Sequence, residues 1–188
     1  VYLVYIDKFK EYKIMCKQVF VDRTTPKGVG IDSVSVVGDS VLIGWSESTS
    51  KDIKDYVLYY DKKGGLSELL DTIDLSLFYY ENSDSIDANS SNQTYRIAAF
   101  DSCGISTGQV DAHSTVYLKS VNINYCDRNI TLERTNYRGW EDDEISYLLV
   151  YKPEGQNYWS PLSAFDFNDL FKDLVDYKEN FEIKVRVI

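Results

Sequence analysis

One phrase occurs twice in this chain of 188 residues. The stretch DYVLYYDKKG covers residues 55–64 and SYLLVYKPEG covers residues 146–155, so that 91 residues separate Tyr56 from Tyr147. An internal repeat constrains the fold strongly, because a repeated sequence implies a repeated structural unit. A period of 91 residues is too long for a solenoid and suits a small domain, since domains begin at roughly 50 residues. The sequence therefore predicts two similar modules.

The segments between turn signals are short and rich in Tyr, Val, Ile, Ser and Thr, which is typical of β-strands. Tyr95 and Phe181 are 86 residues apart, so a second pair of landmarks supports the repeat. The predicted fold class is all-β, with tandem immunoglobulin-like β-sandwiches. Strands are expected at 33–37, 40–45, 56–60, 66–74, 94–102 and 113–121, and again at 121–125, 129–134, 147–151 and 180–188.

The chain divides into three parts. Residues 1–25 are expected to be tail strands of a preceding module and a linker, residues 26–118 one full module, and residues 119–188 a second module without its last strand. A short linker near residue 119 would make the pair semi-rigid. The first residue is Val and no signal peptide is visible, so we expect a processed product or a piece of a longer chain. Phe167, Leu170, Phe171, Leu174 and Val175 have helical spacing, which predicts a short amphipathic helix in the second module.

Large aromatic side chains are expected to form the two cores, because aromatic residues contribute much of the buried area of small domains. Tyr95 fits a tyrosine corner, whose hydroxyl bonds the main chain upstream. Arg134 stands where the repeat would place a second Trp45, and Trp140 is expected to take over that core position. The expected core residues are Trp45, Tyr56, Tyr95, Trp140, Tyr147 and Phe181.

The composition excludes several classes of function. The chain has 30 acidic and 20 basic residues, a net charge of −10, which argues against nucleic acid and anionic membranes as partners. No phosphate-binding loop, hydrolase nucleophile motif or metalloprotease motif is present. His113 is the only histidine, and no nucleophile is paired with it in the sequence. We therefore predict a protein that is not an enzyme and that uses no cofactor and no metal.

Some residues leave alternatives open. Cys16, Cys103 and Cys126 are interpreted as buried free thiols, with a Cys103–Cys126 disulfide as the alternative. The acidic stretches 83–87 and 141–144 are interpreted as solvated loops, with calcium binding as the alternative. Tyr158 and Trp159 form the best candidate for a ligand-binding platform, and partial burial in the core is the competing interpretation.

The residues VLIGW, DIKDYVLYY and TYRIAAFDSCG resemble a fibronectin type III domain. DRTTP, YRIAAFDSCG, HSTVYL, NYRGW and YLLVY further resemble the tandem modules of exported Bacteroidetes surface proteins, which are associated with gliding motility and type IX secretion. That resemblance implies O-glycosylation in Asp-Ser/Thr-apolar triplets, here at Ser33, Ser40, Thr72 and Ser85. Asn89, Asn92 and Asn129 begin N-glycosylation sequons, which matter only for a eukaryotic source.

The resemblance implies an extracellular, cell-surface protein. The expected function is non-enzymatic: the modules would space and present other domains or mediate adhesion, and the partners would be domains of the same protein or other surface proteins. The alternative is an accessory module that binds carbohydrate or another ligand through exposed aromatic residues, with polysaccharide as its partner.

Overall fold

The structure is a computed structural model of the chain. It describes residues 2–6, 12–16, 23–62, 66–82, 88–109, 112–124, 126–127, 129–141, 145–161 and 181–188. Within these ranges all regular secondary structure is β-strand, which confirms the predicted all-β class. The helix predicted around residues 167–175 lies outside the described residues.

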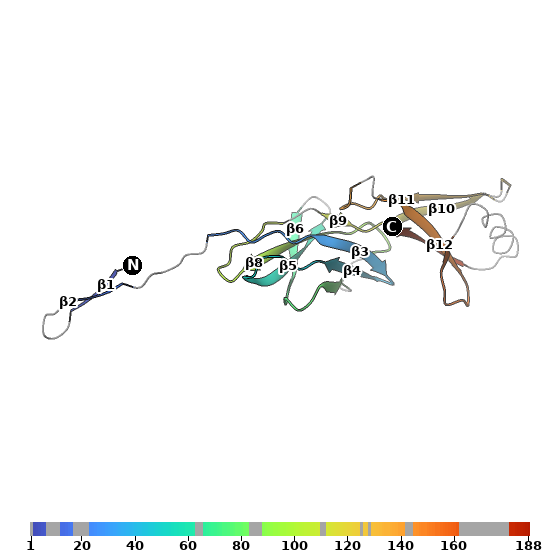
Figure 1. The fold of residues 1–188 in the computed structure, drawn as a ribbon. Coiled ribbons are helices and arrows are strands. Elements are labelled where there is room, and N and C mark those ends of the chain that lie inside the picture. Colours follow the sequence, from blue (N-terminus) through green and yellow to red (C-terminus); the bar gives the residue numbers. More distant parts are fainter. Residues whose placement is uncertain are drawn as a thin grey trace.

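A two-stranded hairpin forms the N-terminal end. Strands β1 (Tyr2–Ile6) and β2 (Tyr12–Cys16) pair antiparallel, with Tyr2 opposite Cys16. The hairpin lies apart from the rest of the described chain (Figure 1). These two strands lie within residues 1–25, where the sequence analysis expects tail strands before the first full module.

The first module consists of seven strands in two sheets. One sheet has the order β3-β4-β7 and the other β6-β5-β8-β9. Because β6 pairs with β5, the fourth strand belongs to the sheet that corresponds to CFG, whereas in immunoglobulin constant domains it belongs to the ABED sheet. The strands are β3 (Ile31–Val37), β4 (Ser40–Trp45), β5 (Ile53–Lys62), β6 (Leu66–Ile73), β7 (Tyr79–Asn82), β8 (Thr94–Asp101) and β9 (His113–Ser114).

Alternation along the strands builds the core between these sheets. In β4, Val41, Ile43 and Trp45 are buried while the residues between them are not. Their side chains pack with those of β5 and β8 in one cluster, so the two sheets face each other as a sandwich. The turn from β3 to β4 contains Gly38 with φ +62°, a conformation that glycine adopts at no steric cost.

The three aromatic residues expected in this core are buried there. Trp45 and Tyr56 meet edge to face, with ring centroids 6.1 Å apart. Burial raises the pKa of the Tyr95 hydroxyl, and the Asn82 side chain beside it opposes that shift. The buried Tyr95 hydroxyl has no hydrogen-bond partner among the described residues, so the main-chain bond of a tyrosine corner is not found there. Tyr56 makes the upstream contact instead, since its hydroxyl accepts the Ser48 N–H at 3.0 Å.

The second module repeats this strand order as far as it is described. Strands β10 (Leu118–Asn124) and β11 (Asn129–Arg134) form one antiparallel pair, and β13 (Ser160–Pro161), β12 (Tyr147–Pro153) and β14 (Phe181–Val187) form a sheet of order β13-β12-β14. That order corresponds to β6-β5-β8 of the first module. Residues 113–121, expected as one strand, are split between β9 and β10.

The repeated tyrosines make the same contact in both modules. The Tyr147 hydroxyl accepts the Tyr137 N–H at 3.0 Å, as the Tyr56 hydroxyl accepts an N–H from Ser48. The partner of the ring differs, because the Arg134 guanidinium lies 3.4 Å from the Tyr147 ring centroid where Trp45 packs against Tyr56. A cation–π contact thus stands in place of an aromatic pair.

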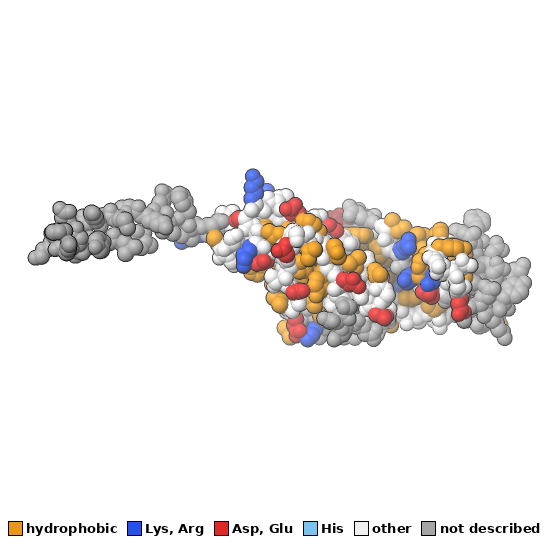
Figure 2. Space-filling view, turned by 90° about the horizontal axis from the view of Figure 1, so that it is seen from below, with side chains coloured by type: hydrophobic (Ala, Val, Ile, Leu, Met, Phe, Trp, Pro, Cys, Tyr) orange, Lys and Arg blue, Asp and Glu red, His pale blue; other side chains and the backbone are white. Residues whose placement is uncertain are grey.

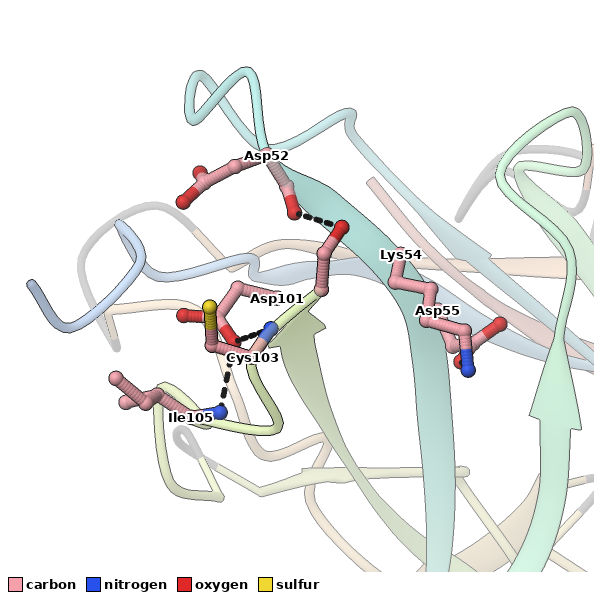
Figure 3. A network of polar contacts seen from close by, with 7 residues as sticks. Asp52, Lys54, Asp55, Asp101, Cys103 and Ile105 are labelled. Carbon is pink, nitrogen blue, oxygen red and sulfur yellow. Dashed lines mark hydrogen bonds and ion pairs between the residues drawn. The ribbon is translucent and has the colours of Figure 1, made fainter. Parts of the chain in front are cut away.

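A buried carboxylate organises the turn that follows β8. Asp101 is 2% exposed, and its Oδ1 accepts the N–H groups of Cys103 at 2.8 Å and Ile105 at 2.7 Å. Its main-chain N–H donates to the Ile105 carbonyl at 2.9 Å, and the Asp52 carbonyl accepts the Ser102 N–H at 3.0 Å. Figure 3 shows the Asp101 carboxylate joined by hydrogen bonds to the main-chain nitrogens of Cys103 and Ile105 in this turn.

Replacing Asp101 by alanine is expected to destabilise the first module by about 1–3 kcal/mol, because the N–H groups of Cys103 and Ile105 lose their acceptor. Urea unfolding of the full chain measures the loss. Asp52→Ala is the matched control: it also removes a carboxylate near the turn but keeps the main-chain carbonyl that Ser102 uses. Equal effects of the two substitutions would contradict this role of Asp101.

Candidate functional site

Main-chain hydrogen bonds join the two modules. The junction segment, residues 135–140, follows β11 and runs beside the chain that leaves β9. Thr135 N–H donates to the Tyr117 carbonyl at 2.8 Å, and Ser114 N–H donates to the Arg138 carbonyl at 2.9 Å. Because Ser114 also pairs with Thr94 of β8, the junction segment adds to the edge of the first module's four-stranded sheet. The two modules meet at this point (Figure 1).

Three rings fill the space behind this ladder. Tyr137 is 4% exposed, and its hydroxyl hydrogen-bonds the Nδ1 of buried His113 at 2.9 Å. The Trp140 ring packs on Tyr137 with centroids 4.8 Å apart, and its Nε1–H donates to the Asp32 carbonyl of β3 at 2.9 Å. Trp140 is therefore a half-buried junction residue. The sequence analysis expected it to take over the core position of the second module, and the structure corrects that expectation. The edge strand β3 is capped by a side chain, which protects its main chain from pairing with other chains.

Gly139 allows the junction segment to approach His113. Its φ is +131°, and a Cβ built on it would lie 2.3 Å from Cγ and Nδ1 of the His113 ring. No side chain fits at that distance, and no L-residue adopts this φ without strain. The glycine is thus required by close approach as well as by conformation.

Burial of Tyr137 makes the junction sensitive to alkaline pH. Loss of solvation raises the pKa of Tyr137 to about 12, and a hydrogen bond from the main chain of Val34 opposes the shift. The folded junction therefore favours the neutral phenol, whereas an unfolded tyrosine ionises near pH 10. This contribution to stability is complete below about pH 10 and is lost as the pH rises through about 12.

We expect the stability difference between the wild-type chain and Tyr137→Phe to shrink across this alkaline window, because phenylalanine cannot ionise. Urea unfolding of both chains at a series of pH values below and within the window measures it. Tyr95→Phe should show the same trend, because burial also raises the pKa of that hydroxyl, which lies outside the junction. A difference that stays constant up to about pH 12 would contradict the assignment.

The two residues predicted as a binding platform have separate environments. Tyr158 is 62% exposed. Trp159 is half-buried, and the ammonium groups of Lys184 and Lys152 lie 4.4 and 5.3 Å from its ring centroid. Trp159 lines the cleft described below, whereas Tyr158 does not. The structure thus does not bring the pair together on one lining surface.

A cleft of about 630 Å³ lies between the modules. One side is β3 of the first module and the linker at residues 116–118, and the other is β14 of the second module with Trp159. Tyr137 and Trp140 of the junction segment also line it. The cleft and the junction therefore form one continuous region, which is the candidate functional site.

The remaining predicted residues lie elsewhere. Cys103 and Cys126 are free and exposed, which corrects both the buried location and the alternative disulfide; the side chain of Cys16 is not described. Among the expected glycosylation sites, Ser33 and Ser40 are half-buried and Thr72 is exposed, while Ser85 lies outside the described residues. Residues 83–87 and 142–144 of the two acidic loops also lie outside the described residues. Tyr147 is half-buried, and for Phe181 the structure describes the strand only.

The described residues contain neither a candidate metal site nor a candidate membrane-spanning helix. In the ranges listed above, no three His, Cys, Asp or Glu side chains are grouped so that they could hold a metal ion. None of the described segments forms a helix of the length and hydrophobicity needed to cross a membrane.

Tyr137, Gly139 and His113 were missed as site residues in the sequence analysis. Their signals were present, since NYRGW stood out as an aromatic cluster and His113 as a single histidine. Nothing in the sequence relates one to the other, because 24 residues separate His113 from Tyr137. The partner of Trp140 is a main-chain carbonyl 108 residues away, which has no sequence pattern at all.

Comparison with known proteins gives a likeness of fold. No protein-family model matches the chain, and no curated protein matches it. Among solved structures, a crystal structure of an Fn3-like protein from Clostridium thermocellum resembles it, with 17% sequence identity and a TM-score of 0.41. The match covers 52% of this chain and 98% of that protein. The Fn3-like match covers about half of the chain, and the all-β class is shown by the antiparallel strands of the described residues themselves.

Proposed function

We propose that this chain is a non-enzymatic structural module of an exported cell-surface protein, in which two sandwiches held at a fixed angle space and present neighbouring domains. The observation that carries the proposal is the junction. It combines a main-chain ladder with the Trp140–Asp32 hydrogen bond and the close approach of Gly139 to His113. A flexible linker would need none of these contacts. Inter-domain motion is the default unless such an interface restrains it.

The proposed location rests on the sequence resemblance to exported Bacteroidetes surface proteins. A net charge of −10 keeps such a module soluble and limits its self-association. Adhesion through other surface proteins belongs to the same proposal.

The two free cysteines allow a direct test of rigidity. Cys103 lies in the first module and Cys126 in the second, and both are exposed. In a Cys16→Ser background, nitroxide labels on these two thiols report the distance between the modules by double electron–electron resonance. We expect one narrow distance distribution. A broad distribution would show that the modules move independently and would refute the role of a fixed spacer.

A second function is favoured by the cleft. Trp159 and Trp140 are both among its lining residues, and aromatic faces stack on sugar rings. We therefore also propose that the module binds carbohydrate at the junction, in place of the Tyr158–Trp159 platform expected from the sequence. The two functions are compatible, since a fixed junction would hold the cleft open in one shape.

A further inference from the structure

The charge of the cleft is opposite to that of the chain. The chain carries a net charge of −10. No Asp or Glu is among the described residues that line the cleft, whereas Lys184 and Arg186 of β14 both line it. Figure 2 shows Lys and Arg side chains grouped on the second module close to its boundary with the first. A cleft whose described lining carries cations and no acids focuses anions on an acidic protein.

The two cations are available to a ligand. Lys184 and Arg186 are exposed, and neither forms an ion pair with any residue that the structure describes. The neighbouring Lys152 differs, since its ammonium is paired with Glu182 at 2.6 Å. Alternate positions on one strand place Lys184 and Arg186 on the same side of β14, about 7 Å apart along the strand. That spacing suits successive charges on an extended ligand.

The rest of the lining supplies contacts for sugar rings. The Lys184 ammonium lies 4.4 Å from the Trp159 ring centroid, and Tyr137 packs on one side of the Trp140 ring. A sugar ring would therefore stack on the parts of the two rings that these contacts leave open. Ser33 and Ser35 contribute hydroxyl groups from β3. The Asn89 amide at the rim already donates to Asp39 at 2.9 Å. Rings, hydroxyls and cations in one cleft match a ligand with apolar faces, hydroxyls and carboxylates.

We propose that the cleft binds an acidic oligosaccharide, whose sugar rings stack on Trp159 and whose carboxylates bind Lys184 and Arg186. This inference rests on the carbohydrate-binding function proposed above and names its substrate class. Arg binds carboxylates with two parallel N–H donors and Lys binds them as a point charge. A nucleic acid would need more cations than the described lining supplies, because its affinity depends on many phosphate contacts.

The test is a titration of the full chain followed by tryptophan fluorescence and calorimetry. The probes are oligogalacturonate, oligomannuronate and hyaluronan oligosaccharides, with fully methyl-esterified oligogalacturonate as a probe of the same rings without charge. We expect at least one uronate to bind, with affinity that falls as salt rises, and its uncharged form to bind at least about tenfold more weakly. Lys184→Gln and Arg186→Gln should each weaken binding about tenfold.

Lys62→Gln is the matched control, because Lys62 is also exposed on a strand but is paired with Glu68 in the first module. It should leave the affinity unchanged. Equal binding of esterified and free oligogalacturonate would overturn the acidic class while leaving carbohydrate binding in place. Binding of hexaglutamate without any uronate would overturn it in favour of an acidic peptide. No binding of any charged or neutral oligosaccharide would overturn both this inference and the carbohydrate-binding function.

Discussion

Replacing Gly139 by alanine is expected to detach the two modules from one another. The new Cβ would lie 2.3 Å from Cγ and Nδ1 of His113, and the φ of +131° would strain any L-residue. The junction segment would have to move away, which removes the hydrogen bonds of Tyr137 to His113 and of Trp140 to Asp32. We expect a loss of about 2–4 kcal/mol in junction stability, from backbone strain and broken buried contacts.

The spin-label distance between Cys103 and Cys126 measures this outcome. The narrow distribution of the parent chain should become broad in Gly139→Ala, while the first module keeps its unfolding midpoint. Gly155→Ala is the control, because Gly155 has φ +80° but nothing within 4 Å of its Cβ position. It tests backbone strain without a clash and should leave the distance unchanged. A narrow, unshifted distribution in Gly139→Ala would show that His113 does not restrain the junction.

The fold was predictable because its signals are local. Period-two alternation in segments such as 40–45, and turn residues such as Gly38 with Asp39, indicate strands and their connections wherever they occur. The repeat added long-range information, since two landmarks at nearly equal spacing imply a common structure. Partners inside the core were harder to predict. Tyr95 packs where expected, yet the contact with upstream main chain belongs to Tyr56 and Tyr147.

The site was much less predictable, for a physical reason. Its key acceptor is the main-chain carbonyl of Asp32, and every residue has such a carbonyl. The need for glycine at position 139 arises from the distance to one ring and not from its neighbours in sequence. Net charge is also an average over the chain: a value of −10 does not reveal a cleft whose described lining holds no acid.

Trp45→Ala is expected to cost about 3–5 kcal/mol, whereas Arg134→Ala at the repeated position should cost about 0.5–2 kcal/mol. Trp45 is 3% exposed and packs edge to face on Tyr56, so its removal leaves a cavity that the sheets cannot close. Arg134 is half-buried over Tyr147, and its guanidinium also donates to Asn136 Oδ1 at 2.7 Å. Its removal opens a surface and loses polar contacts, but it leaves no sealed void.

Hydrogen exchange of the full chain, read by mass spectrometry for each module, separates the two effects. Trp45→Ala should raise exchange in β4, β5 and β8 and leave β12 and β14 nearly unchanged, because the junction joins the modules through Tyr137 and Trp140 without sharing a core. Trp45→Phe, which keeps most of the volume, covers the case in which the alanine variant does not fold. Equal destabilisation by Trp45→Ala and Arg134→Ala would mean that the two repeated positions contribute equally to the stability of their modules. The cation–π contact would then be a full substitute for the aromatic pair, and the second module would depend on Arg134 as much as the first depends on Trp45.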